Sequence, residues 1–302
     1  MRVRLLGTSA GGGFPQWNCA CRVCQAAREG AARPRMQSSA AVSADGVRWF
    51  LLNASPDVRF QIEAFAPLRP PRGAVRGSGI EAVLLTNADL DHTLGLLLLR
   101  EGGPLRSYAS APTKRSLQSG LRLPTLLEAY GGSNFVAPPK ELAPLPLNDG
   151  SPSGLRFMAF PVPGKPPRYL ESTRAFARFD NVGYRIEDLA TGGRLLFIPD
   201  AGAIDAVVER QLAQCDLLLF DGTFWDEREM LPLGGRPAAA MAHLPVGGPV
   251  GSLRRLGPLP IGRKIYIHLN NSNPMLLDRS PERELVLAAG MEIGEDGVEV
   301  VV

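Results

Sequence analysis

Residues 80–100 read IEAVLLTNADLDHTLGLLLLR and join two apolar runs through a short polar turn. The first run has the length of a buried strand, and the second is long enough for a helix. The turn between them carries Asp89, Asp91 and His92. Polar side chains at the carboxyl end of a strand, directly before a helix, are where α/β proteins usually place their sites. The stretch therefore predicts an α/β fold with a metal site at a strand end.

Composition and charge exclude several classes of protein. The chain has 302 residues, of which 45% are hydrophobic, and this is enough for a sizeable core. Its net charge is +3, and it lacks the long basic run that is typical of nucleic-acid binding. It also lacks an apolar run of about 18 residues, and glycines interrupt the apolar start MRVRLLGTSAGGG. We therefore expect a soluble cytoplasmic protein that binds neither nucleic acid nor a membrane, while its oligomeric state stays open.

Short apolar strands dominate the chain, and helical patterns separate some of them. The order of strands and helices predicts one domain over residues 1–302, an αββα sandwich of two mixed sheets with helices outside. The 27 prolines are spread through the connections and indicate no linker between domains. Strands are expected in residues 1–7, 38–44, 47–54, 81–87, 105–110, 155–162, 182–188, 194–202, 216–224 and 264–270, and helices in residues 55–65, 91–102, 205–215 and 280–290.

The chain has only three histidines, and each stands near the end of an apolar strand or at the start of a loop. Two further aspartates, Asp200 and Asp221, end apolar strands in the same manner. A single such histidine is often a hydrogen-bonded structural residue, and a single aspartate is often a helix N-cap. Their joint placement favours a metal site. The histidines are His92, His243 and His268, and the carboxylates that accompany them are Asp89, Asp91 and Asp200.

Three of the four cysteines form the pattern Cys19-x-Cys21-x-x-Cys24. Disulfides are rare in the cytosol, and three close thiolates suit a tetrahedral zinc ion that takes one further ligand. An iron–sulfur cluster would need a fourth cysteine, and Cys215 is distant in the sequence. We therefore expect structural zinc, with unbound thiols as the alternative. Asn271, Gln16 and water are the candidates for the fourth ligand.

The segment NADLDH, residues 87–92, resembles the signature His-x-His-x-Asp-His of the metallo-β-lactamase superfamily. Asn87 and Asp89 stand where that signature has its first two histidines, whereas Asp91 and His92 match it. By the same resemblance, Asp200 corresponds to the bridging carboxylate of the superfamily and His268 to its last histidine. The resemblance implies the αββα metallo-β-lactamase fold.

Seven segments between residues 7 and 274 carry a narrower resemblance, namely GTSAGGGFPQWNCACRVC, LLNASPDVRFQI, TNADLDHTLGLLLLREG, FIPDAG, FDGTFWDEREM, MAHLPV and IHLNNSNP. It implies a family of pyrroloquinoline quinone (PQQ) biosynthesis proteins, which make that redox cofactor from a precursor peptide. Its members are regarded as iron-dependent enzymes that use O₂ to hydroxylate the tyrosine ring of a cross-linked Glu–Tyr intermediate, so other enzymes of the pathway are possible partners.

The residue chemistry agrees with an oxygenase better than with a dizinc hydrolase. A dizinc centre of the superfamily uses about five histidines, more than this chain contains. Two histidines and carboxylates with open positions suit Fe(II) and O₂. Metal-dependent hydrolysis, or non-catalytic carriage of the quinone or its precursor, are the alternatives. The expected iron ligands are Asp89, Asp91, His92, Asp200 and His268; Asp91 and His243 are catalytic candidates, and His243 is either an acid–base group or a third metal ligand.

Four basic residues in one long proline-containing loop are candidates for substrate binding. Guanidinium and ammonium groups match the several carboxylates of a Glu–Tyr substrate. The alternative is a loop whose basic side chains only face solvent. The four residues are Lys165, Arg168, Arg174 and Arg178.

Overall fold

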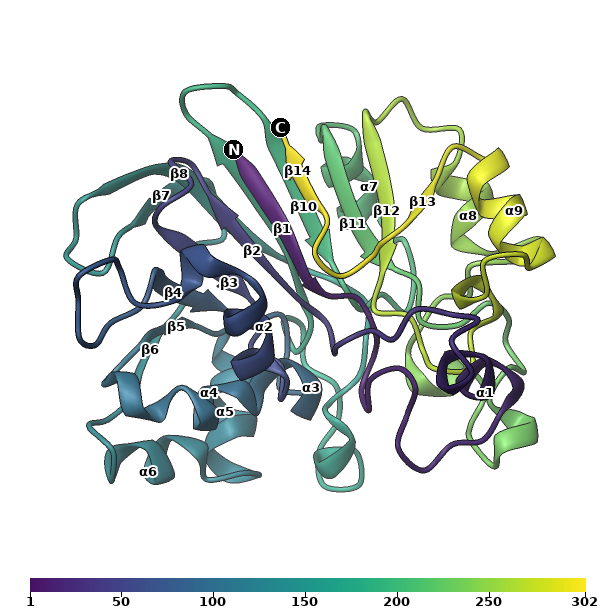
Figure 1. The fold of residues 1–302 in the computed structure, drawn as a ribbon, viewed down its shortest axis with the longest axis horizontal. Coiled ribbons are helices and arrows are strands. Elements are labelled where there is room, and N and C mark those ends of the chain that lie inside the picture. Colours follow the sequence, from purple (N-terminus) through teal and green to yellow (C-terminus); the bar gives the residue numbers. More distant parts are fainter.

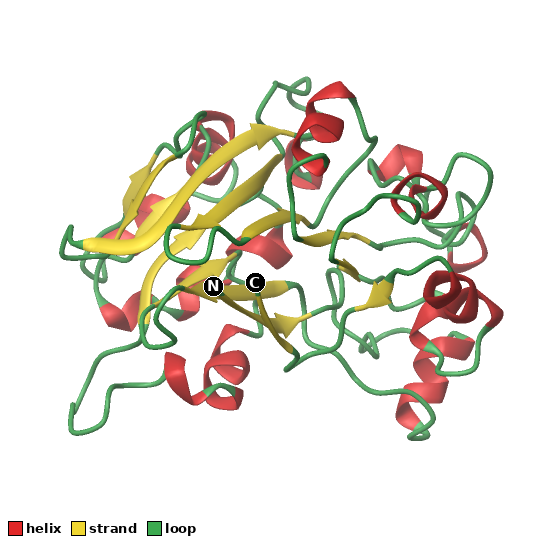
Figure 2. Cartoon of the chain, turned by 90° about the horizontal axis from the view of Figure 1, so that it is seen from above, coloured by secondary structure: helices red, strands yellow, loops and turns green.

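Two mixed sheets of seven strands each lie face to face in the computed structural model, which describes residues 1–302 (Figures 1 and 2). The first sheet has the order β14-β1-β2-β3-β4-β5-β6 and the second the order β13-β12-β11-β10-β9-β8-β7. The strands of the first sheet are β1 Arg2–Gly7, β2 Ser39–Ser43, β3 Trp49–Leu52, β4 Ile80–Leu84, β5 Arg106–Tyr108, β6 Asn134–Val136 and β14 Glu299–Val301. Those of the second are β7 Ala143–Pro146, β8 Pro152–Pro161, β9 Val182–Asp188, β10 Arg194–Ile198, β11 Leu217–Asp221, β12 Arg263–Ile267 and β13 Glu292–Ile293.

The two sheets share one scheme of strand directions. In the first sheet the pairs from β14 to β3 are antiparallel and the pairs from β3 to β6 are parallel. In the second sheet the pairs from β7 to β10 are antiparallel and those from β10 to β13 are parallel. The carboxyl ends of β10, β11 and β12 therefore lie along one edge, where loops that carry polar groups can meet.

Helices cover the outer faces of both sheets (Figure 1). Helices α2 and α4–α6 contribute buried residues to the core outside the first sheet, and α1 and α7–α9 do so outside the second. None of the helices combines the length and apolar character needed to cross a membrane. The helices are α1 Arg22–Arg28, α2 Val58–Ala64, α3 Leu90–Thr93, α4 Gly95–Leu98, α5 Ala111–Ser119, α6 Leu123–Glu128, α7 Ala206–Leu212, α8 Ser252–Leu256 and α9 Pro281–Ala288.

Strand β10 shows how the sequence builds this four-layer arrangement. Leu195 and Phe197 point into the core between the sheets, while Leu196 and Ile198 point into the core beneath the helices. All four side chains have no exposed surface. A strand that is buried on both faces needs a continuous apolar run, and this is why LLFI ends only where the polar site begins. The hydrophobic effect on both faces therefore holds the strand ends in place.

The predicted αββα sandwich of two mixed sheets with outer helices is confirmed. Each of the ten predicted strands has a counterpart, and so do three of the four predicted helices. The four short strands β6, β7, β13 and β14 were not predicted, because two to four residues carry too little alternation to be recognised. Helices α1, α5, α6 and α8 were also missed.

The single helix expected over residues 91–102 is wrong. The segment forms α3, α4 and a 3₁₀ turn at Arg100–Gly102. Gly95 begins α4, and its amide donates a hydrogen bond of 2.9 Å to the carbonyl of Ala54. A Cβ atom at position 95 would lie 2.4 Å from the carbonyl oxygen of Ser55. The close contact of two backbones, which apolar periodicity does not reveal, accounts for the break.

We predict that Gly95→Ala destabilises the fold by about 1–3 kcal/mol, because the new methyl group would overlap the backbone of residues 54–55. The urea midpoint of unfolding measures this change. Gly102→Ala is the matched control, since a Cβ atom there has no neighbour within 4 Å and the change should stay within about 0.5 kcal/mol. Equal midpoints for the two variants would contradict the role given to Gly95.

Candidate metal centre

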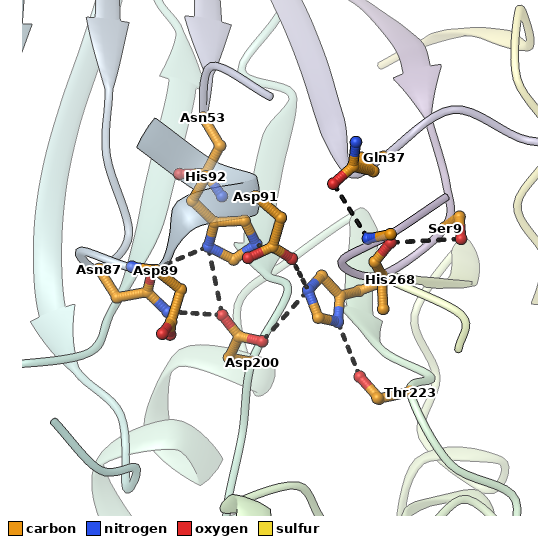
Figure 3. Close-up of polar contacts among 12 residues, drawn as sticks. Ser9, Gln37, Asn53, Asn87, Asp89, Asp91, His92, Asp200, Thr223 and His268 are labelled. Atoms are coloured by element: carbon orange, nitrogen blue, oxygen red, sulfur yellow. Dashed lines mark hydrogen bonds and ion pairs between the residues drawn. The ribbon is translucent and has the colours of Figure 1, made fainter. Parts of the chain in front are cut away.

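Four strands deliver polar side chains to one edge of the sandwich. The short helix α3, which follows β4, brings Asp91 and His92, and the ends of β10 and β12 bring Asp200 and His268 (Figure 3). His243 comes from the long connection between β11 and α8. Burial of each preceding strand fixes where its end lies, so the side chains meet although they are far apart in the sequence.

These residues form two groups that share His268. In the first group, Oδ2 of Asp91 lies 3.1 Å from Nε2 of His268 and 3.8 Å from Nε2 of His92. In the second group, Oδ1 of Asp200 lies 3.5 Å from Nε2 of His268 and 3.8 Å from Nδ1 of His243. In each group the donor atoms fall within 4.8 Å of one another. The spacing suits one or two metal ions.

The hydrogen bonds of His92 leave one nitrogen free for a ligand. Nδ1 lies 2.9 Å from Oδ1 of Asn87, which can only accept, so this nitrogen carries the proton. Nε2 is buried and has no hydrogen-bond partner. A buried lone pair with no partner is unfavourable. A metal ion beside Asp91 satisfies it, and the residues present therefore fit a metal.

Asp221, which was noted as a strand end but not selected as a site residue, orients two histidines. Its buried carboxylate accepts hydrogen bonds from the amides of Ala201 and Thr223, from the Thr223 hydroxyl at 2.6 Å and from Nδ1 of His243 at 2.8 Å. Because the Thr223 hydroxyl donates to Asp221, its oxygen accepts from Nδ1 of His268 at 2.7 Å. Both histidines thus keep Nε2 available for a ligand or a proton, which is the usual task of carboxylates behind metal-binding histidines.

The geometry around His268 requires a cation. Its Nε2 lone pair would face the Asp91 carboxylate at 3.1 Å, so a proton or a metal ion must lie between them. Burial alone would lower the pKa of His268, but Asp200 and Asp91 outweigh burial and raise it to about 10. Burial, together with the charges of Asp91 and Asp200, raises the pKa of Asp89 to about 6. Three carboxylates therefore draw positive charge into this pocket.

Asn87 occupies one side of Asp200. Its Nδ2 donates to Oδ2 of Asp200 at 2.7 Å, while its Oδ1 accepts from the amide of Asp89 at 3.0 Å (Figure 3). One oxygen of Asp200 is thereby engaged by an amide, and the other faces His268. A carboxylate held in this way is turned toward the His268 side of the pocket.

The cavity over these residues has a volume of about 260 Å³. The glycine-rich loop after β1 forms part of its wall, and a Cβ atom at Gly11 would lie 3.3 Å from Oδ2 of Asp91. Asp89 lines the cavity but belongs to neither group of donor atoms. The lining residues that the argument uses are Gly11, Asp89, Lys165, Arg168, Asn181 and Arg236.

Of the four basic residues that were expected to bind the substrate, only two line the cavity. Lys165 and Arg168 line the cavity, whereas Arg174 and Arg178 do not. Arg174 binds the buried Asp180 through two hydrogen bonds of 2.6 and 2.8 Å, and Arg178 lies exposed over the ring of Phe179. Sequence reasoning missed Arg236 and Asn181, although Arg236 precedes His243 by only seven positions in the same connection.

The three clustered cysteines come together at the start of α1. Cys21 is its N-cap and Cys24 lies in its first turn, so the thiols stand on a helix end and not on a loop alone. Their sulfur atoms fall within 4.8 Å of one another, and Cys215 is buried elsewhere. Nδ2 of Asn271 lies 3.2 Å from Sγ of Cys24, whereas Gln16 lines the hollow beside Cys19. Both proposed fourth ligands are thus near the cluster.

Comparison with known proteins agrees with the fold. The family model described as "Beta-lactamase superfamily domain" matches residues 48–269. A diphosphatase of the PhnP family, at 21% identity and a TM-score of 0.69 over 99% of this chain and 97% of its own, shares the fold. The fold and the grouped histidines and aspartates define a metal-dependent member of the beta-lactamase superfamily.

Full-length relatives give the particular family. Coenzyme PQQ synthesis protein B of Methylococcus capsulatus is 44% identical over the whole of both chains, and that of Azotobacter vinelandii is 42% identical over 99% of each. The crystal structure of Zn²⁺-bound PqqB from Methylobacterium extorquens is similar with a TM-score of 0.89 and 39% identity, and the match covers both chains fully. The chain belongs to the coenzyme PQQ synthesis protein B family.

We predict that Asp221→Asn weakens metal binding at this centre by about 10–100-fold. An asparagine can accept at only one oxygen, so His243 or the Thr223–His268 pair loses its acceptor. Competition with a coloured chelator measures the affinity. Asp216→Asn is the matched control, because Asp216 precedes the same strand at its opposite end and pairs with Arg194. Equal affinities in the two variants would refute the orienting role.

Proposed function

We propose that this protein is an Fe(II)- and O₂-dependent hydroxylase in PQQ biosynthesis, acting on the tyrosine ring of a cross-linked Glu–Tyr intermediate. The names of the full-length relatives support the pathway. The observation that carries the chemistry is the donor set of two histidines and carboxylates around one pocket, which is the set that non-haem iron oxygenases use. In this proposal His92 and His268, with Asp91 and Asp200, hold the iron.

Asn87 supports a single metal ion over a dinuclear hydrolytic pair. In this chain an amide binds Oδ2 of Asp200, on the side where the superfamily signature would place a histidine ligand. The chain has only three histidines, whereas a dinuclear centre of the superfamily uses about five. Bound Fe(II) would supply activation of O₂. The side chains of the protein would position the substrate ring beside the iron and transfer protons.

His243 is the acid–base group in this proposal. Its Nδ1 is fixed by Asp221 at 2.8 Å, and its ring lines the cavity. Burial alone would lower the pKa of His243, but Asp221 and then Asp200 raise it above the ordinary value. Such a histidine can exchange a proton with the phenol of the substrate through Nε2.

The reaction balances as a monooxygenation. An aromatic C–H bond becomes C–OH with one oxygen atom from O₂, and the other oxygen atom leaves as water. Two electrons and two protons come from an external reductant such as ascorbate.

The proposal predicts O₂ uptake and a product heavier by one oxygen atom for each hydroxylation. Anaerobic loading with Fe(II), addition of the cross-linked Glu–Tyr compound and ascorbate, and exposure to O₂ test it by mass spectrometry. Asp91→Ala and His92→Ala should lower the rate at least 100-fold, because each removes a donor of the same group. Asp149→Asn, at an exposed turn, is the control and should retain the rate.

Two other results would replace this proposal. Turnover of a phosphodiester or ester without O₂ would favour a metal-dependent hydrolase, which the superfamily fold also accommodates. Tight binding of the quinone, without conversion of any compound under any metal or O₂ condition, would favour a carrier.

A second proposal concerns the cysteines, which we assign to structural zinc. We predict that Cys19→Ser lowers the zinc content by about one equivalent and destabilises the fold, because tetrahedral zinc needs all three thiolates. Elemental analysis of purified protein measures this. Cys215→Ser is the matched control and should keep the zinc, since Cys215 lies outside the cluster. Equal zinc in both variants would exclude the assignment.

A further inference from the structure

The side-chain amide of Asn181 forms no hydrogen bond with another group of the protein. Its side chain lines the cavity and is 95% buried, with 5% of its surface exposed. Oδ1 is buried without a hydrogen-bond partner. A buried acceptor left in this state is unfavourable unless a ligand supplies a donor. The group therefore points to something that binds in the cavity.

The surrounding chain is built to place this amide. A Cβ atom at Gly164 would lie 1.6 Å from Nδ2 of Asn181, so only glycine leaves room for it. The residue before it, Asp180, is held by the two hydrogen bonds from Arg174 and by the amide of Ala177. The amide of Val162 in turn binds the carbonyl of Asn181 at 3.0 Å. Its position is thus determined from both sides.

Three cations line the same cavity. Lys165 and Arg168 belong to the loop before β9, and Arg236 belongs to the connection before His243. Glu171 pairs with Lys165 and binds Arg236 through contacts of 2.9 and 3.3 Å. One carboxylate neutralises only one of the three cations. Arg168 forms no ion pair, and Nε of Arg236 is buried without a partner.

Glu171 acts as a positioning residue for this cluster. Arg236 and Lys165 lower the pKa of Glu171 to about 2, so it stays ionised and ties two separate loops together. Tyr169, two residues earlier, anchors the same loop through a 2.9 Å hydrogen bond to the carbonyl of Ala88. Arg168 directly precedes Tyr169 and lines the cavity wall.

We propose that Arg168, Arg236 and Asn181 recognise a free α-amino acid group of the substrate. The guanidinium groups bind its carboxylate, and Oδ1 of Asn181 accepts a hydrogen bond from its amino nitrogen. The choice of an amino acid rests on the proposed function, whereas the recognition of a carboxylate beside an N–H donor rests on the site itself.

The charge distribution explains how this site would orient the substrate. The carboxylates of Asp89, Asp91 and Asp200 repel a substrate carboxylate, while the cations attract it. An amphoteric molecule therefore enters with its acid group toward Arg168 and Arg236. The aromatic ring of the substrate then lies next to the metal ligands.

Calorimetric titration of the zinc-loaded protein tests the inference without turnover. The probes are the cross-linked Glu–Tyr compound and the same compound with its carboxylates as methyl esters. Arg236→Gln and Asn181→Leu should each weaken binding of the acid about tenfold or more, because each removes a hydrogen bond to a charged group. Arg178→Gln removes a charge from the same loop outside the cavity and should bind like the wild type.

The ester separates recognition from general damage. It should bind the wild type at least tenfold more weakly than the acid, and Arg236→Gln should weaken it little further. Gly164→Ala should reproduce the loss seen in Asn181→Leu, since it displaces the amide. Circular dichroism and zinc content confirm folding of each variant. Equal affinity for acid and ester, or unchanged affinity in both Arg236→Gln and Asn181→Leu, would overturn the inference.

The two proposals fail in different ways. Carboxylate-dependent binding to the zinc-loaded protein, without O₂ uptake by the iron-loaded protein, would support the recognition site and refute the hydroxylase. Hydroxylation that is unaffected by Arg236→Gln and Asn181→Leu would support the hydroxylase and overturn the recognition site.

Discussion

The buried carboxylate of Asp221 is the interaction on which the arrangement of the site depends. It stands at the end of β11 and accepts hydrogen bonds from the loop after β10, from Thr223 and from His243. Through Thr223 it also fixes His268 at the end of β12. A buried anion is tolerated only when its oxygens are satisfied. The four donors meet this need and join three strand ends into one unit.

The other buried charges of the pocket also need partners. Asp91 and Asp200 are close to histidine nitrogens, and the buried Nε2 of His92 lacks a partner. A protein that gathers several carboxylates in a low-dielectric pocket needs a cation there. The fold supplies the rigidity, because strands buried on both faces cannot shift their ends independently. The candidate metal centre thus forms because strands that are buried on both faces end where polar residues begin.

Much of this could be predicted from the sequence, because continuous apolar runs such as LLFI and LLLF mark strands whose ends must be close. Histidines at those ends predicted a candidate metal centre, since histidine is scarce in this chain. The positions of Asn181 and Arg236 at the cavity could not be predicted, because they depend on how two long loops fold over the site. The pairing of Arg174 with Asp180 is equally invisible in the sequence, where both look like ordinary loop charges.

The cysteine cluster and the metal centre are linked by a short piece of backbone. His268 adopts a left-handed conformation with φ of 56°, which few non-glycine residues take, and Asn271 follows it by three positions. The carbonyl of Asn271 faces the sulfur atoms of Cys21 and Cys24, and its side chain contacts Cys24. Strain of this kind persists only when surrounding contacts hold it. Because Thr223 holds the ring of His268 and the cysteines hold Asn271, the segment is fixed at both ends. Order at the cysteine cluster therefore contributes to the position of a histidine that both groups of candidate metal ligands share.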